Sequence, residues 1–265
     1  MKLKTKADNI LNVIRPFAAI ADAATIKLTK DSIQIKTVDA AHVCMMQADV
    51  NMANAVRESS AAYEIGDGCP DKDLHTYYVD VLRLGSALIP AKGQDVTLHI
   101  ADGCLIVESE TFRHRMKLKD NGNDPKLPVW DETLMGKFTV SAQTMKKAIA
   151  YMRRQKTSDH VEIRYDGCGV ISYSTEEHLS DQEKKDKARS ARIEFFERVP
   201  QLDTHVRASR YPTEYLYDIL KVLNPTAESG HALMLVLDND YPVGLRYARG
   251  NAQIRYLLAP RIEND

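Results

Sequence analysis

Apolar and polar residues alternate along the chain in pairs of short segments, and a polar turn joins the two members of each pair. The pairs occupy residues 25–38, 96–107, 161–173 and 232–247. Alternation with a period of two predicts half-buried β-strands. In the third pair Asp166 and Gly167 lie between the two segments, and an Asp-Gly turn favours a tight hairpin. The pattern therefore predicts four antiparallel hairpins.

A helical pattern precedes each hairpin, with apolar residues recurring at intervals of three and four. The helical segments are residues 8–15, 80–88, 141–152 and 212–221. This spacing gives each helix one buried face. Asp80 is suited to cap the second helix, and Pro212 favours the start of the fourth. Pro16 should bend or break the first helix, because proline lacks the amide that a helix needs.

The helix-hairpin unit is an internal repeat. The four hairpins begin at Thr25, Val96, Val161 and Ala232, so that successive starts are 65 to 71 residues apart. A nearly fixed period predicts a repeated architecture. We expect an α+β fold of two similar domains, residues 1–118 and 137–265. Residues 119–136 would connect them, since Gly, Asn, Asp and Pro concentrate there.

Composition excludes several classes of protein. The chain has 265 residues, of which 44% are hydrophobic and 28% charged, as in a water-soluble globular protein. No apolar run approaches the roughly 20 residues that span a bilayer, and no signal peptide is evident, so we expect a cytoplasmic protein without a membrane partner. The four cysteines are scattered without a C-x-x-C pair, which favours free thiols over a zinc or disulfide framework.

The sequence contains no catalytic constellation among the common phosphate-loop, dinucleotide and nucleophile motifs. Asp39 and His42, three residues apart, could be an acid–base pair or part of a metal site, but a metal needs more ligands. His42 could instead be a hydrogen-bonding histidine at the end of a strand. A thiol- or metal-dependent enzyme that uses His42 with Cys44 remains the alternative from a different functional class.

Three segments resemble the archaeal and eukaryotic DNA polymerase sliding clamps, the proliferating cell nuclear antigen (PCNA) family. They are the C-terminal residues 256–265, residues 38–47 with their Asp-x-x-His-Val pattern, and Asp240-Tyr241-Pro242 before the last strand. The resemblance covers nearly the whole chain and is weakest between residues 152 and 206. The net charge of −1 departs from the family, whose members are usually clearly acidic. The first helix also departs, since it offers only Arg15 as a basic residue.

The resemblance implies two similar clamp domains with helices lining a pore and antiparallel sheets outside. Three subunits would close into a homotrimeric ring through two different patches on each subunit. Unpaired edge strands are natural patches; the resemblance places one in residues 111–118 and the other near residues 170–175. The interface residues it implies are Arg113, Arg115, Met116, Ile171 and Tyr173.

Basic residues gather on or beside the predicted helices. By themselves such charges usually mark a solvated helix face, but in the clamp fold they would face the phosphates of duplex DNA. The resemblance therefore implies sequence-independent DNA contacts by Lys146, Lys147, Arg153, Arg154, Lys221 and Arg83. No motif that enters a DNA groove is present, so we expect no base-specific contacts.

The resemblance also implies an apolar pocket for partner peptides that carry a PIP box, a Gln followed by one aliphatic and two aromatic residues. The pocket residues would be His42, Val43, Met45, Leu127, Pro128, Pro242, Ala259, Pro260 and Ile262. The alternative is that Leu127 and Ile262 pack against the body of the protein and bind no ligand.

A clamp of this kind would be a processivity factor in DNA replication and repair, with no catalysis and no cofactor of its own. It would tether DNA polymerase, flap endonuclease and ligase, and a separate ATP-driven clamp loader would open it. The alternative within the family is a paralogous subunit of a heterotrimer used in repair.

Overall fold

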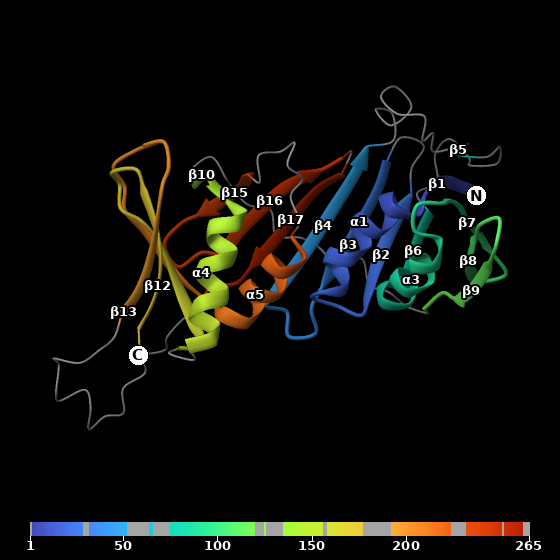
Figure 1. The fold of residues 1–265 in the computed structure, drawn as a ribbon, viewed down its shortest axis with the longest axis horizontal. Coiled ribbons are helices and arrows are strands. Elements are labelled where there is room, and N and C mark those ends of the chain that lie inside the picture. Colours follow the sequence, from blue (N-terminus) through green and yellow to red (C-terminus); the bar gives the residue numbers. More distant parts are fainter. Residues whose placement is uncertain are drawn as a thin grey trace. The chain divides into compact units, whose positions relative to one another are not determined.

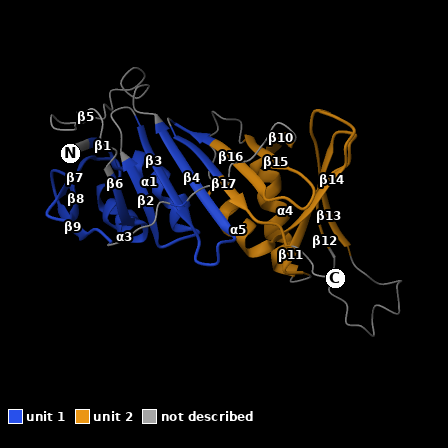
Figure 2. Cartoon of the chain, turned by 180° about the vertical axis from the view of Figure 1, so that it is seen from behind, with its two compact units in different colours: residues 1–128, 248–255 blue, residues 129–247, 256–265 orange. Residues whose placement is uncertain are grey.

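The computed structural model describes residues 2–28, 32–51, 64–65, 75–119, 125, 135–155, 158–176, 192–223, 232–250 and 252–261. The chain divides into two compact units (Figure 2), the first formed by residues 1–128 with 248–255 and the second by residues 129–247 with 256–265. Most of the proposed connecting segment, 119–136, lies outside the described residues, so the exact domain boundary stays a prediction.

Among its described residues, the first unit contains strands of two antiparallel sheets and two α-helices (Figure 1). One sheet has the order β6 (His75–Asp80), β2 (Ala23–Leu28), β3 (Ser32–Val38) and β4 (Cys44–Asn51). The other has the order β5 (Glu64–Ile65), β1 (Lys2–Lys6), β7 (Asp95–Ala101), β8 (Cys104–Glu108) and β9 (Arg113–Lys117). The helices α1 (Ala7–Ala18) and α3 (Val81–Leu88) pack beside each other, and the 3-10 turn η1 (Ile89–Ala91) follows α3.

Each helix of the first unit buries the apolar face that the sequence indicates. On α1 the buried side chains include Leu11, Ile14 and Phe17. Pro16 does not end this helix, which continues to Ala18, although the missing proline N–H removes one i→i−4 hydrogen bond. The predicted cap of α3 is confirmed, because the Asp80 carboxylate accepts a hydrogen bond of 2.9 Å from the Arg83 amide.

The second unit repeats this plan. One of its sheets has the order β14 (Arg207–Pro212), β11 (His160–Tyr165), β12 (Val170–Glu176) and β13 (Arg192–Arg198). In the other, β10 (Gly136–Ser141) pairs with β15 (Ala232–Leu237), which pairs with β16 (Val243–Arg249). The helices α4 (Ala142–Gln155) and α5 (Thr213–Val222) lie side by side. The last strand of the chain, β17 (Ala252–Leu258), has its first four residues in the first unit and the rest in the second.

The two units therefore share one connectivity. The sheet order β6-β2-β3-β4 in the first unit matches β14-β11-β12-β13 in the second, strand for strand along the chain. The predicted α+β repeat of four helix-hairpin modules is confirmed by these elements. In the second unit the core is rich in aromatic residues: the Phe138 and Tyr165 ring centroids lie 4.5 Å apart, and Tyr173 and Tyr211 are fully buried. None of the helices within the described ranges is long and apolar enough to cross a membrane.

Candidate functional site

The paired helices of the second unit present a basic surface. Met145, Ile149 and Met152 on α4 are buried. The exposed side chains of α4 and α5 include the predicted DNA contacts Lys146, Lys147, Arg153, Arg154 and Lys221. Across the two helices, the Lys146 ammonium donates a hydrogen bond of 3.2 Å to the Lys221 carbonyl oxygen. The structure thus places two lysines, 75 residues apart in sequence, side by side on one exposed surface.

Arg153 differs from these lysines because a carboxylate already neutralises its charge. Its Nε lies 2.7 Å from Glu214 Oε2 on α5, and its guanidinium stacks 4.2 Å above the Tyr217 ring. The hydrogen bond to Glu214 raises the pKa of Arg153 above its ordinary value. Arg154 donates a hydrogen bond of 3.3 Å to the Ala150 carbonyl of its own helix. We therefore rank Arg153 below the lysines as a phosphate contact.

The helices of the first unit carry fewer basic residues. Arg83 on α3 has a side chain that is 75% exposed and lies 3.6 Å from the carboxylate of Asp80. Arg15, in the last turn of α1, is also exposed. These two residues give the first unit a weaker positive surface than the second.

Strand β9 lies at the edge of its sheet, as the edge-strand hypothesis requires. Its Arg113 and Arg115 side chains are exposed, whereas Met116 is buried. Arg113 Nε lies 2.8 Å from Glu108 Oε1, and Arg115 Nη2 lies 3.5 Å from Asp102 Oδ2. The predicted interface arginines are therefore on a sheet edge, and Met116 belongs to the core of the first unit.

The predicted edge in the second unit is wrong. Residues 170–175 lie in β12, which pairs with β11 on one side and β13 on the other. Ile171 and Tyr173 are 0% exposed, because their side chains pack into the core of the unit. The edge strand is β13, and its Phe196 is 62% exposed. The signal that could have identified β13 is the cluster Ile193, Phe195 and Phe196 between charged residues.

The turn before β4 is organised by the Asp39 carboxylate. Its oxygens accept hydrogen bonds from the amides of Ala41, Val43 and Cys44, at 3.1, 2.8 and 2.7 Å. These bonds hold His42 in a left-handed backbone conformation, with φ of 58°. As a result, His42 is exposed, and Val43 and Met45 are half-buried.

The same geometry argues against the metal or thiol enzyme. The Asp39 carboxylate is occupied by backbone amides, and Cys44 is fully buried. Burial, and then the charge of Asp39, raise the pKa of the Cys44 thiol well above its ordinary value, so it stays protonated at neutral pH. In the part of the chain that the structure describes, no three His, Cys, Asp or Glu side chains are grouped to hold a metal ion.

Two further segments of the predicted peptide pocket are fixed by hydrogen bonds within the second unit. The Tyr211 hydroxyl donates to the Tyr241 carbonyl at 2.8 Å, next to Pro242. The Arg261 amide donates to the Arg210 carbonyl at 2.8 Å, directly after Ala259 and Pro260, which are half-buried. Leu127, Pro128 and Ile262 lie outside the described residues. The pocket as a whole therefore stays a prediction.

Asp39→Ala should destabilise the protein and disorder the His42 turn. The variant leaves three backbone amides without their acceptor, and an unsatisfied buried donor costs about 1–3 kcal/mol. We expect the free energy of unfolding, measured by urea denaturation, to fall by at least this amount. Asp22→Ala, at an exposed loop position, is the matched control and should change little. Equal stability of Asp39→Ala and the parent would show that the carboxylate does not hold the turn.

Two α+β units with the same strand order, each with a helix pair, define a class of fold: the DNA clamp. No family model matches the chain. A DNA polymerase sliding clamp from Methanocella arvoryzae is 28% identical over 271 residues, which cover 100% of this chain and 99% of that protein. One from Methanosarcina mazei is 24% identical over 272 residues, which again cover 100% and 99%.

Solved structures of PCNA also match this chain over nearly its whole length. A. fulgidus PCNA, solved with the C-terminal region of FEN-1 bound, matches with a TM-score of 0.77 and 24% identity, covering 100% of this chain and 99% of that one. PCNA from Thermococcus kodakaraensis matches with a TM-score of 0.73 and 16% identity, covering 98% and 99%. The chain is similar to DNA polymerase sliding clamps along its whole length and has the PCNA fold, which confirms the resemblance predicted from sequence.

Proposed function

We propose that this protein is a sliding clamp, a DNA polymerase processivity factor that encircles duplex DNA and tethers replication and repair enzymes. The observation that carries this proposal is the duplicated architecture, which matches clamp relatives over the whole chain. Three copies would place six similar units around one axis. The clamp would catalyse no reaction itself, and a separate ATP-driven loader would open the ring.

The ring would close through β9 of one copy and β13 of the next. These are different edges, so the contact is heterologous and can generate a closed ring. Pairing β9 with β13 would provide hydrogen-bond partners for the unpaired N–H and C=O groups of both edge strands. Left unpaired, such groups favour aggregation. Phe196 supplies an exposed apolar anchor on β13, and Arg113 and Arg115 supply polar contacts on β9. This assignment replaces Ile171 and Tyr173 as interface residues.

DNA would contact the exposed helix surface that carries Lys146, Lys147 and Lys221. Lysine side chains on a helix surface attract phosphates without distinguishing base sequence. A ring can function with such weak contacts because topology, rather than affinity, keeps it on DNA. The neutralised Arg153 is consistent with such weak contacts, because tight binding to phosphates would slow the sliding of the ring along DNA.

Tethering is proposed to use PIP-box peptides from polymerase, flap endonuclease and ligase. The support is the resemblance of residues 38–47 and of the C-terminal segment to the family's peptide-binding segments, and the FEN-1 segment bound to the A. fulgidus neighbour. The exposed His42 and the half-buried Val43, Met45 and Pro242 give accessible surface to such a peptide. Apolar anchors of this kind concentrate binding energy in a few contacts.

A PIP-box peptide should bind the parent protein, and Leu127→Ala and Ile262→Ala should each weaken binding. Truncating an apolar anchor costs above about 1 kcal/mol, which is roughly a fivefold or larger rise in Kd. Isothermal calorimetry measures the Kd values, and a peptide with both aromatic residues replaced by alanine is the control. A parent that does not bind, or two variants that bind as tightly as the parent, would overturn the pocket assignment.

A further inference from the structure

Strand β14 holds two of the segments that the resemblance assigns to the peptide pocket. It lies at the end of its sheet, next to β11. The Tyr211 hydroxyl donates a hydrogen bond of 2.8 Å to the carbonyl of Tyr241, the residue before Pro242. The carbonyl of Arg210, the residue before Tyr211, accepts a hydrogen bond of 2.8 Å from the Arg261 amide. Both pocket segments are therefore attached to neighbouring residues of one strand.

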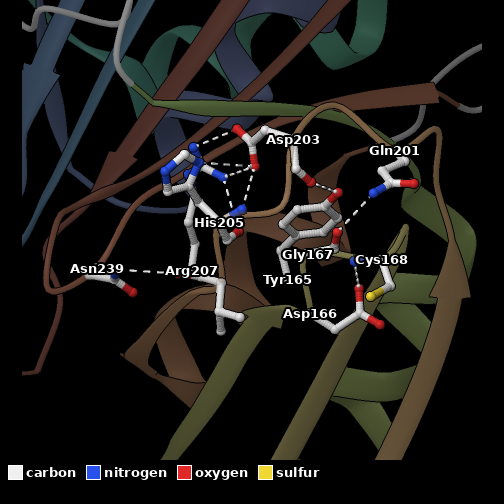
Figure 3. A network of polar contacts seen from close by, with 10 residues as sticks. Tyr165, Asp166, Gly167, Cys168, Gln201, Asp203, His205, Arg207 and Asn239 are labelled. Atoms are coloured by element: carbon white, nitrogen blue, oxygen red, sulfur yellow. Dashed lines mark hydrogen bonds and ion pairs between the residues drawn. The ribbon is translucent and has the colours of Figure 1, made fainter.

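The start of β14 is itself fixed by a network of polar contacts (Figure 3). The Arg207 side chain, which is 8% exposed, donates two hydrogen bonds of 2.8 Å to the Asp203 carboxylate. The Tyr165 hydroxyl on β11 donates one of 3.0 Å to the Asp203 carbonyl, and the Ala208 amide donates one of 2.7 Å to the Asn239 side chain. These contacts join β14 to the loop before it and to the turn between β15 and β16, so the strand is a firm support for the C-terminal segment.

The Arg261 side chain forms an ion pair with Asp159. Its guanidinium donates a hydrogen bond to the Asp159 carboxylate, 102 residues away in sequence. The other carboxylate oxygen lies 3.3 Å from His160 Nδ1, and the Asp159 carbonyl accepts a hydrogen bond of 2.9 Å from the Thr213 amide at the start of α5. The hydrogen bond from Arg261 lowers the pKa of Asp159, so this carboxylate is charged at neutral pH. Asp159 therefore connects the C-terminal segment to the start of α5 and to the start of β11.

We infer that the Asp159–Arg261 ion pair positions residues 259–261 on β14 for a partner peptide. This inference rests on the proposed function, because it concerns the peptide pocket that the clamp would use. Residues near a chain terminus usually move unless other contacts hold them. The ion pair and the Arg261 amide hold the segment that contains Ala259 and Pro260, so a peptide would not have to order that segment when it binds. Asp159 and Arg261 are positioning residues, which act without touching the peptide.

The exposure of the two side chains limits the size of the effect. Asp159 is 61% exposed and Arg261 45% exposed, and an exposed ion pair contributes little by itself and is screened by salt. We therefore expect loss of the pair to raise the Kd of a PIP-box peptide about threefold to fivefold at low salt. At about 1 M salt the difference from the parent should nearly disappear. Arg261→Lys, which keeps the positive charge, should weaken binding less than Arg261→Gln.

A double-mutant cycle tests this inference. Calorimetry gives the Kd of a PIP-box peptide for the parent, Asp159→Asn, Arg261→Gln and the double variant. If the pair acts as a unit, both single variants and the double variant should lose affinity to the same extent. Loss of affinity in Arg261→Gln but not in Asp159→Asn would overturn the inference and indicate that Arg261 touches the peptide directly. Lys92→Gln, which removes one positive charge from an exposed position of the first unit, is the control and should bind as the parent does.

Hydrogen exchange in the free protein provides a second readout, which does not depend on a peptide. The Arg261 amide should exchange faster in Asp159→Asn and in Arg261→Gln than in the parent, because the segment is then held less firmly on β14. Unchanged exchange of this amide, or an unchanged Kd in both variants when the parent binds the peptide, would overturn this inference alone. A parent that does not bind a PIP-box peptide would overturn the proposed pocket and this inference with it.

Discussion

Phe196→Asp should convert the assembled ring into single subunits. Phe196 is 62% exposed on the edge strand β13, where it can contribute to an interface without contributing to the core of its own unit. Central aromatic anchors contribute about 2 kcal/mol or more to an interface, and a buried unpaired carboxylate adds a desolvation cost. Light scattering at micromolar concentration should give three times 29.8 kDa for the parent and 29.8 kDa for the variant.

Met234→Asp is the matched control for this prediction. Met234 is 41% exposed, but it lies on β15, which pairs with β10 on one side and β16 on the other. The control should therefore remain a trimer. A trimeric Phe196→Asp would contradict the assignment of β13 as the interface. If the parent is monomeric, the homotrimer hypothesis is wrong, and a ring built with paralogous subunits is favoured.

Lys146→Glu combined with Lys221→Glu should strongly reduce association with duplex DNA. The two residues are adjacent on the exposed α4–α5 surface, so the change replaces two attractions with two repulsions in every subunit. The slope of log affinity against log salt should become shallower by roughly 0.9 for each phosphate that a lysine no longer neutralises. Association with a short duplex, measured by anisotropy over a salt series, gives the slope.

The control here is Arg153→Gln combined with Glu214→Gln, which removes an ion pair without changing the net charge. It should leave the salt dependence nearly unchanged, because the Arg153 charge is already neutralised by its partner. Unfolding curves of both double variants should match that of the parent, since all four side chains are exposed. An unchanged slope in the lysine variant would show that DNA contacts another surface.

The sequence predicts the local elements well because their signals are local. Alternating residues indicate the hairpins, and the Asp80 cap and the apolar spacing indicate the helices. Strand β13 was missed because it follows a long charged stretch and its alternation is interrupted by adjacent Phe195 and Phe196. The prediction that β12 is an edge strand was wrong for a different reason. Whether a strand lies at the edge of a sheet depends on which other strands pair with it, and no local pattern encodes that pairing.

The candidate sites also combine features that local sequence patterns predict with features that depend on tertiary packing. Exposure of Lys146, Lys147 and Lys221 could be predicted, because the buried faces of α4 and α5 follow helical periodicity. Neutralisation of Arg153 could not, since Glu214 is 61 residues away in sequence and meets it only through helix packing. The role of Asp39 as the acceptor for three amides of its own turn also required the structure.

The central claim, that this protein encircles DNA, can be tested by topological trapping. The protein is incubated with a linear duplex, both ends are blocked with bulky protein caps, and the salt concentration is raised to abolish phosphate contacts. A ring should remain on the capped duplex, be lost from an uncapped one, and be released when the capped duplex is cut in the middle. Equal loss from capped and uncapped DNA at high salt would contradict the account.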